Sequence, residues 1–326
     1  MTQRLSSDAG RGILILGSGG QLGSELHKLY PEAICYDHSS GGANYLDLQD
    51  NGKLEQAILS SKCKWIINAA AYTNVDACEM NNEIAYRVNG LAVNSMVKAA
   101  RKIGSSLLHV STDYIFDGKR GLYKESDLPN PLNYYGISKL IGEVFAMAFE
   151  DSLIIRTSGV YGSKNNFPNF AYRQMKSGKQ LKVLDGYYSP IHAKNLALAI
   201  RALVENDRKG ILNVAGMRIS RIELAQEIAS KYDLDKSLIN KVEKIESMKA
   251  IRPDSKTYSK WFGTILSEAN GIMLWIPPGF AHGFQALQES HVYYKATAEF
   301  SQKNATTVKR YRYYSKLRSI SAFINV

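Results

Sequence analysis

The chain has 326 residues, of which 45% are apolar and 22% charged, which argues against wholesale disorder and suits one large domain or two smaller ones. Its three cysteines lack a C-x-x-C spacing, which argues against a disulfide framework or zinc ribbon, and no apolar run is long enough to span a membrane. The net charge of +11 includes five basic residues between positions 309 and 318, which we interpret as a solvated tail, so we expect no nucleic-acid partner. From the cysteines and the lack of a long apolar run, we expect a cytoplasmic protein with no membrane partner.

Short apolar runs alternate with longer helical patterns through the first half of the chain. In chain order, we expect strands at 13–16, 33–36, 65–69, 107–110 and 153–156, and helices at 21–29, 54–59, 85–103 and 139–149. The strands are continuous apolar runs, which is typical of a parallel sheet covered on both faces. With right-handed crossovers, this order predicts an α/β protein with a doubly wound, Rossmann-like parallel sheet.

The second half of the chain has shorter elements. Helices near 195–204 and 221–232 predict a smaller C-terminal substrate lobe, built mainly from residues 157–253. From Trp261 onward, alternating residues around Pro277-Pro278-Gly279 predict short antiparallel strands with tight turns. We therefore divide the chain into a main domain at 12–253, a β-rich segment at 254–304 and a basic tail at 305–326.

A glycine-rich turn joins the first strand to the first helix. Its glycines allow a tight turn and close approach of a pyrophosphate, and the helix N-terminus offers free N–H groups. We assign to dinucleotide binding Gly17, Gly20, Gln21, Leu22 and Gly23. Asp37 closes the second strand, about 20 residues after the first of these glycines, where an acid can accept a hydrogen bond from a ribose 2′-hydroxyl and favour NAD over NADP. A surface loop acid is an equally good interpretation of Asp37.

Two further motifs carry groups suited to proton transfer. Tyr135 and Lys139 stand one helical turn apart, so both side chains lie on one helix face. A nearby ammonium lowers a tyrosine pKa from about 10 toward the working pH, and such a tyrosine can protonate a carbonyl oxygen as hydride arrives. Thr112 follows a strand at the edge where α/β sheets bind ligands. Taken singly, a surface pair and a helix cap are the plainer interpretations of these motifs.

Together, these motifs resemble the extended short-chain dehydrogenase/reductases over residues 12–253, and within them the dTDP-4-dehydrorhamnose reductases. The matching strings lie at 17–23, 68–76, 88–89, 111–118, 131–143 and 156–158. The resemblance implies that the catalytic residues are Thr112, Tyr135 and Lys139. It implies that the cofactor cleft is lined by Asp47, Leu48, Ala69, Ala70, Ala71 and Thr73, with Tyr135 and Lys139, and that the sugar lies by Val75, Thr112, Tyr114 and Tyr135.

The implied reaction is reduction of the 4-keto group of a dTDP-6-deoxy sugar, dTDP-4-dehydro-L-rhamnose, with NADPH or NADH as cofactor. The resemblance favours NADPH, in conflict with the interpretation of Asp37 as a ribose ligand. The alternatives are a non-catalytic regulatory or binding subunit on the same fold, and a bifunctional reductase–epimerase. The family commonly has Trp where this chain has Gly159, which leaves the exact sugar open. The resemblance also allows a homodimer joined by Mg²⁺, with Glu25 at one ligand position, and it implies no metal in the active site.

The segment from residue 254 to about 297 resembles part of the dTDP-4-dehydrorhamnose 3,5-epimerases, which are cupin barrels. The resemblance rests on the string at 274–284 and on Tyr294-Lys295. It implies that His282 lines the epimerase pocket and that Tyr294 is the epimerase's catalytic tyrosine. The proton-abstracting histidine of that family has no counterpart in the chain. We therefore expect a cupin-like fragment without epimerase activity, joined to a reductase of the same pathway.

Overall fold

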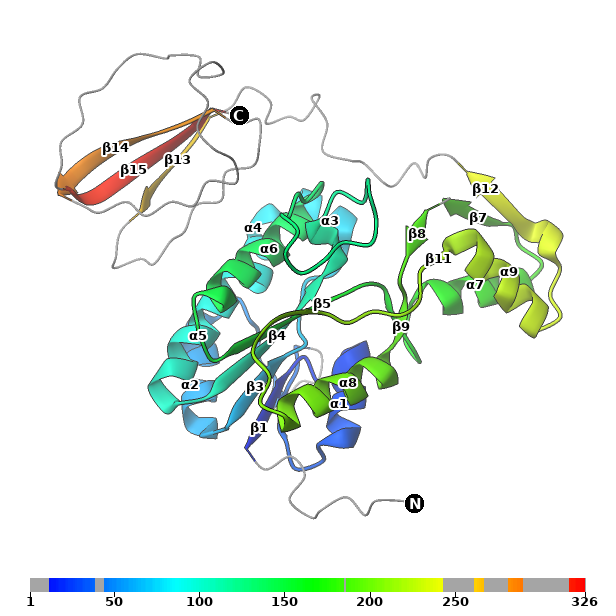
Figure 1. The fold of residues 1–326 in the computed structure, drawn as a ribbon, viewed down its shortest axis with the longest axis horizontal. Helices are drawn as coiled ribbons and strands as arrows, with labels where there is room; N and C mark the ends of the chain where they lie inside the picture. The colour runs from blue at the N-terminus through cyan, green and yellow to red at the C-terminus, as the bar shows by residue number, and fades with distance from the viewer. Residues whose placement is uncertain are drawn as a thin grey trace. The chain divides into compact units, whose positions relative to one another are not determined.

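The computed structural model describes residues 12–38, 44–184 and 186–242, together with the backbone of strands at 261–266, 281–289 and 317–325 (Figure 1). By its internal contacts the chain divides into one unit at Met1–Ala250 and a second at Ile251–Val326. The first unit carries every residue assigned above to the reductase site.

A six-stranded parallel sheet forms the centre of the first unit, in the order β10-β5-β4-β3-β1-β2. Its strands are β1 (Ile13–Leu16), β2 (Ile34–Tyr36), β3 (Trp65–Asn68), β4 (Ser106–Thr112), β5 (Ser152–Thr157) and β10 (Gly210–Asn213). Because β1 lies between β2 and β3, the winding direction reverses there. A ligand crevice is expected at such a reversal, beyond the carboxyl ends of the strands. The doubly wound α/β fold predicted from the sequence is confirmed.

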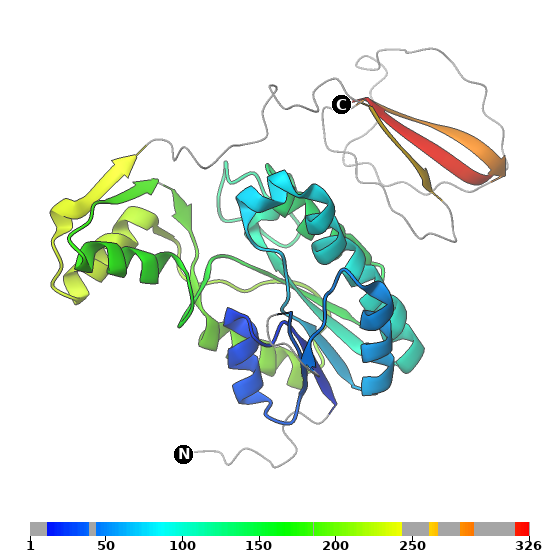
Figure 2. The same ribbon diagram turned by 180° about the vertical axis from the view of Figure 1, so that it is seen from behind.

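Helices cover both faces of this sheet (Figures 1 and 2). One face packs against α2 (Asn51–Ser61), α5 (Ala92–Ile103) and α6 (Tyr134–Met147), and the other against α1 (Gln21–Leu29) and α8 (Ala193–Glu205). Successive residues of β1 alternate between the two cores, Leu14 and Leu16 to the first and Ile13 and Ile15 to the second. Burial of both faces explains why the strands are continuous apolar runs.

The helical pattern at 85–103 is interrupted in the structure. It consists of α4 (Asn82–Ala85), a π-helical turn at Tyr86–Leu91, and α5. A Cβ at Gly142 of α6 would overlap the backbone oxygen of Asn89, so α6 packs directly against the π-helical turn. Such turns are frequent at functional sites. Two further helices, α3 (Val75–Met80) and α7 (Phe167–Lys176), were not predicted from the sequence.

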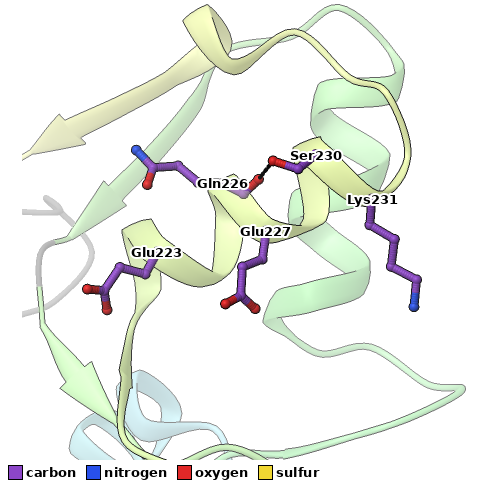
Figure 3. Close-up of a pocket in the computed structure, with 5 residues that line it drawn as sticks. All are labelled: Glu223, Gln226, Glu227, Ser230 and Lys231. Atoms are coloured by element: carbon purple, nitrogen blue, oxygen red, sulfur yellow. Dashed lines mark hydrogen bonds between the residues drawn. The ribbon is translucent and has the colours of Figure 1, made fainter.

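A smaller lobe follows β5 and has a hydrophobic core of its own. Helices α7 and α9 (Arg221–Lys231) pack on the pair β7 (Leu181–Leu184) and β12 (Ile239–Val242), around Ala171, Leu181 and Ile228. Two short pairs complete the lobe, β6 (Val160–Tyr161) with β9 (Ile191–His192), and β8 (Tyr187–Tyr188) with β11 (Ile219–Ser220). Figure 3 shows an open hollow along α9 with a mixed lining of Glu223, Gln226, Glu227, Ser230 and Lys231.

The described part of the second unit is an antiparallel sheet in the order β13-β15-β14. Its strands are β13 (Trp261–Leu266), β14 (Ala281–Glu289) and β15 (Leu317–Asn325). His282 stands in β14, opposite Ile324 of β15. The remainder of the segment that we expected to be cupin-like, including Tyr294, lies outside the described residues, as does the basic tail before β15.

Candidate active site

The glycine-rich turn after β1 has the shape that a pyrophosphate requires. Gly17 has a φ of 82°, and a Cβ at this position would lie 2.7 Å from the Cα of Ala70. A Cβ at Gly23 would overlap the carbonyl oxygen of Gly17, so α1 can approach the turn only without a side chain there. The N-cap residue, Gly20, provides no side-chain cap, which leaves N–H groups of the first helical turn available to an anion. These residues therefore fit a dinucleotide.

Three further residues assigned to the cofactor lie in or beside this turn, namely Gln21, Leu22 and Asp37. The Gln21 amide donates to the backbone oxygen of Val160 at 3.3 Å and accepts from the Lys164 N–H at 2.8 Å, which joins α1 to the loop after β6. Leu22 is buried in the core, so only its backbone can face a phosphate. The Asp37 carboxylate occupies the space that a Cβ at Gly19 would need, so it lies directly against the turn.

The other residues assigned to the cofactor lie in the segments that follow β2 and β3. The Leu46 N–H donates to the backbone oxygen of Asp37 at 3.1 Å, which brings the neighbouring Asp47 and Leu48 beside the end of β2. Leu48 itself is buried in the core, whereas Asp47 is partly exposed. Ala69 donates its N–H to Leu16 at 3.0 Å, and the segment that follows β3 continues with Ala70, Ala71 and the exposed Thr73.

Thr112 and Tyr135 meet at the carboxyl end of β4. The Tyr135 phenol lies close to the Thr112 side chain. Oγ1 of Thr112 accepts from the N–H of Tyr114 at 3.2 Å and donates to Oδ1 of Asp113 at 3.3 Å. The Tyr114 ring packs edge-on against that of Tyr135, with centroids 5.6 Å apart. A Cβ at Gly136 would overlap the Tyr114 carbonyl oxygen, so a glycine is needed for α6 to bring Tyr135 this close to β4.

Lys139 lies behind this pair and is almost completely buried. Its Nζ donates to the Val110 oxygen at 2.7 Å and lies 3.4 Å from Nε2 of His109. Burial lowers the pKa of Lys139 to about 8, although the Glu143 carboxylate opposes this shift. Burial also raises the pKa of Tyr135 well above its usual value, and the nearby Thr112 hydroxyl only partly offsets this rise. The prediction of a lowered Tyr135 pKa is therefore wrong here, because desolvation dominates.

A cavity of about 370 Å³ opens beside Tyr114, the neighbour of Thr112 and Tyr135, and extends into the smaller lobe. Its lining includes Asp113 and Tyr114 after β4, Gly159 after β5, and Tyr188 and Arg221. A Cβ at Gly159 would lie 3.1 Å from the Tyr188 ring, so Tyr188 occupies the space beside this glycine. Thr112, Tyr135 and Val75 are not among its lining residues; Val75 begins α3 at the edge of the site.

Sequence reasoning missed several residues that hold the site together. Asn89 accepts from the Tyr72 N–H at 2.8 Å and donates to the Ser138 hydroxyl at 2.9 Å, so it ties α6 to the segment after β3. Glu143 and Arg156 form a buried ion pair at 2.8 Å between α6 and β5. Asn89 belongs to a matched string, but no local pattern reveals which side chain will lie against it.

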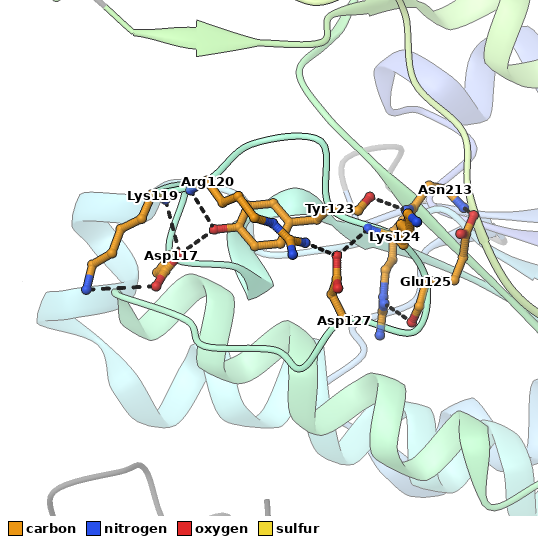
Figure 4. A network of polar contacts seen from close by, with 9 residues as sticks. Asp117, Lys119, Arg120, Tyr123, Lys124, Glu125, Asp127 and Asn213 are labelled. Atoms are coloured by element: carbon orange, nitrogen blue, oxygen red, sulfur yellow. Dashed lines mark hydrogen bonds and ion pairs between the residues drawn. The ribbon is translucent and has the colours of Figure 1, made fainter.

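The loop after β4 is held by a network of polar contacts, shown in Figure 4. Tyr123 hydrogen-bonds to Asp117, and Arg120 pairs with Asp127. Asn213 of β10 donates from its side chain to the backbone oxygen of Tyr123 at 2.9 Å and from its backbone N–H to the Glu125 carboxylate at 2.8 Å. This network anchors the loop to the edge strand of the sheet.

The expectation of a metal at a dimer interface gains no support. Glu25 forms an ion pair with Lys28 at 2.6 Å. Within the described residues, no group of three or more His, Cys, Asp or Glu side chains is placed to hold a metal ion. In the same part of the chain, no helix is long and apolar enough to cross a membrane.

A doubly wound sheet with a glycine-rich turn after β1 and a Thr–Tyr–Lys group around β4 defines the class of nicotinamide-dependent oxidoreductases. The chain belongs to the family described as RmlD substrate binding domain, whose model matches residues 11–261. A second model, described as dTDP-4-dehydrorhamnose 3,5-epimerase, matches residues 245–312. Both agree with the resemblances seen in the sequence.

Individual relatives support this assignment. The chain is 38% identical to a dTDP-4-dehydrorhamnose reductase of Aggregatibacter actinomycetemcomitans, over 59% of this chain and 67% of that protein. A structure of a hypothetical dTDP-4-dehydrorhamnose reductase from Sulfolobus tokodaii matches with a TM-score of 0.70 and 47% identity, over 74% of this chain and 89% of that one. The structure of the Bacillus anthracis dTDP-4-dehydrorhamnose reductase in complex with NADP matches with a TM-score of 0.67 and 30% identity, over 73% of this chain and 86% of that one.

Proposed function

We propose that this protein uses NAD(P)H to reduce the 4-keto group of a dTDP-6-deoxy sugar, dTDP-4-dehydro-L-rhamnose, to the alcohol. The observation that carries the proposal is the close approach of Thr112 and Tyr135 next to a cavity, in the same unit as a turn shaped for a dinucleotide. The names of the relatives supply the sugar class, and the Bacillus anthracis structure supplies the cofactor class.

The proposed roles of the residues follow from their positions. The nicotinamide, when bound, supplies the hydride. Tyr135 remains protonated because burial raises its pKa, so it can donate its proton to the carbonyl oxygen that becomes the alcohol. The Thr112 hydroxyl, close to that phenol, holds the same oxygen. Lys139, below both, is positioned to contact the nicotinamide ribose once its amine leaves the Val110 oxygen.

Asp37 bears on the choice between the two cofactors. Its carboxylate lies against the glycine-rich turn, beside the end of β2, where the adenosine ribose of a dinucleotide is expected. There it would accept a hydrogen bond from a free 2′-hydroxyl and repel a 2′-phosphate. We therefore propose that NADH is the better cofactor of this chain, although a relative was crystallised with NADP.

The domain boundaries and partners are proposals of the same kind. Residues 12–253 would form the reductase, with substrate contacts mainly from 157–253, and the 254–304 segment would be an epimerase-like fragment followed by the 305–326 tail. The intact Thr112, Tyr135 and Lys139 favour an enzyme over a non-catalytic binding subunit, and the missing epimerase base argues against a bifunctional enzyme. A homodimer would be compatible with either role.

The test is oxidation of NADH by the purified full chain in the presence of dTDP-4-dehydro-L-rhamnose. Turnover should fall about 10²–10⁴-fold in Tyr135→Phe, which removes the proposed proton donor. The matched control is Tyr134→Phe, which removes the neighbouring phenol and should stay close to wild type. Equal activity of wild type and Tyr135→Phe would remove Tyr135 from the mechanism.

A further inference from the structure

Three buried polar side chains form a row behind the catalytic pair, namely Asn68 in β3, His109 in β4 and Lys139 in α6. Their exposures are 1%, 0% and 1%. The strand register sets Asn68 beside His109, with Nδ2 of the amide 3.0 Å from Nδ1 of the ring. The other ring nitrogen, Nε2, lies 3.4 Å from Nζ of Lys139. The proposed reaction gives no role to Asn68 or His109.

The hydrogen bonds of Asn68 fix the protonation state of His109. Oδ1 of Asn68 accepts from the Ala70 N–H at 3.2 Å, so the amide cannot be turned around without losing this bond. Its Nδ2, which can only donate, therefore faces Nδ1 of His109. A ring nitrogen that faces a donor must be unprotonated, so the ring is neutral and carries its proton on Nε2. Burial acts in the same direction, because it lowers the pKa of His109.

This tautomer directs an N–H group at Lys139. Two donors would face each other if Nζ were an ammonium, whereas a neutral amine presents a lone pair to the ring. The Val110 oxygen accepts an N–H of Lys139 in either state. We propose that His109 is a positioning residue that disfavours the ammonium form of Lys139 in the ligand-free protein, with Asn68 fixing the histidine tautomer.

Of the other ionisable groups around Nζ, the Glu143 carboxylate favours an ammonium, but burial outweighs it. Glu143, one turn further along α6, is paired with Arg156 of β5, whose Nε and Nη2 both donate to its carboxylate. Tyr135, one turn earlier, remains a neutral phenol because burial raises its pKa. Together with His109 of β4, these groups of the described structure supply no net negative charge beside Lys139.

The inference rests on the proposed function, because that function places Lys139 in the site, and it adds a reason why the site favours reduction. By disfavouring the ammonium of Lys139, His109 weakens the positive charge beside Tyr135, which helps Tyr135 to remain the phenol, the form that must donate a proton. The Ala70 N–H at the other end of the row belongs to the segment that packs on Gly17 of the glycine-rich turn. The row therefore joins the dinucleotide turn to the amine of Lys139.

The direct test is the tautomer of His109 in the full chain. Long-range ¹H–¹⁵N spectra of protein labelled with ¹⁵N-histidine distinguish a protonated from an unprotonated ring nitrogen, and His109→Phe identifies the resonance among the six histidines. We expect an unprotonated Nδ1 and a protonated Nε2 throughout the neutral range. A proton on Nδ1, alone or in an imidazolium, would overturn the proposal.

The isosteric variant Asn68→Asp should reverse the row. Its carboxylate would accept from Nδ1–H of His109, so Nε2 would become an acceptor for the Lys139 ammonium. The proton affinity of Lys139, followed by the ¹³Cε shift in a pH titration, should rise about tenfold or more. The control is Asn89→Asp, which adds the same charge where its side chain contacts Ser138 of α6 and not His109. No rise in Asn68→Asp, or an equal rise in both variants, would refute the role of His109.

These outcomes are independent of catalysis. If Asn68→Asp does not fold, as judged by circular dichroism, the tautomer in the wild-type protein still decides the question. The expected tautomer without any NADH oxidation would refute the proposed function and leave the positioning role standing. Full reductase activity with the opposite tautomer would refute the positioning role alone.

Discussion

Replacing Lys139 with methionine should stabilise the folded protein near neutral pH and make its stability less dependent on pH. The ordinary pKa of 10.5 falls to about 8 in the folded state because the side chain is buried. Each pKa unit corresponds to about 1.4 kcal/mol, so keeping Lys139 protonated in the fold costs up to about 3 kcal/mol. Methionine fills a similar volume and carries no charge.

The sign of the pH dependence follows from proton binding. Between about pH 8 and the ordinary lysine pKa, the unfolded chain holds a proton that the folded chain has released, so stability rises with pH. Below about pH 8, Lys139 is protonated in both the folded and the unfolded chain, so the full cost of burying its charge is present. The wild type should therefore gain about 2 kcal/mol relative to Lys139→Met between about pH 7 and about pH 10. Shifts at Tyr135 and Tyr188 are common to both proteins and cancel in this difference.

The assay is urea unfolding followed by circular dichroism at several pH values, with the free energy of unfolding extrapolated to water. Lys98→Met is the matched control, because Lys98 is an exposed lysine of α5. This variant should follow the wild-type pH dependence. A constant difference between wild type and Lys139→Met across the range would show that Lys139 has an ordinary pKa, and would remove the basis for a disfavoured ammonium.

Other predictions concern the cofactor and the second unit. Gly23→Ala should weaken NADH binding by about tenfold or more in a fluorescence titration, because its Cβ would overlap the Gly17 oxygen. Gly20→Ala should have a milder effect, because its Cβ would lie 3.1 Å from that oxygen. Equal NADH affinities of the two variants would contradict the assigned geometry. Asp37→Asn should shift the ratio of kcat/KM toward NADPH, and an unchanged ratio would exclude Asp37 from ribose recognition. In deuterated water, the protein alone should place no deuterium at C3 or C5 of the 4-keto sugar, and its appearance would establish epimerase activity.

The elements around the cofactor crevice were largely predictable because local signals define them. The apolar run of β1 and the glycines after it determine where β1 ends and α1 begins, and both elements have the predicted bounds. The start of α6 was not predictable. It begins at Tyr134, where Asn133 caps the Gly136 N–H and the distant Glu79 accepts from the Tyr134 N–H at 2.6 Å.

The electrostatics of the site were the least predictable part. Tyr135 and Lys139 were recognised from their spacing, but the direction of the tyrosine pKa depends on how deeply each side chain is buried. His109 lies in a strand that the sequence shows only as an apolar run, and its partners come from β3 and α6. Such contacts follow from tertiary packing, so a single sequence gives no signal for them.

The most direct test of the central claim is transfer of the hydride itself. NADH dideuterated at nicotinamide C4 should be incubated with the full chain and dTDP-4-dehydro-L-rhamnose, and the sugar analysed by NMR and mass spectrometry. We predict one deuterium, located at C4 of the resulting dTDP-6-deoxy sugar, and its loss in Tyr135→Phe. A sugar that binds but acquires no deuterium at C4 would contradict the account.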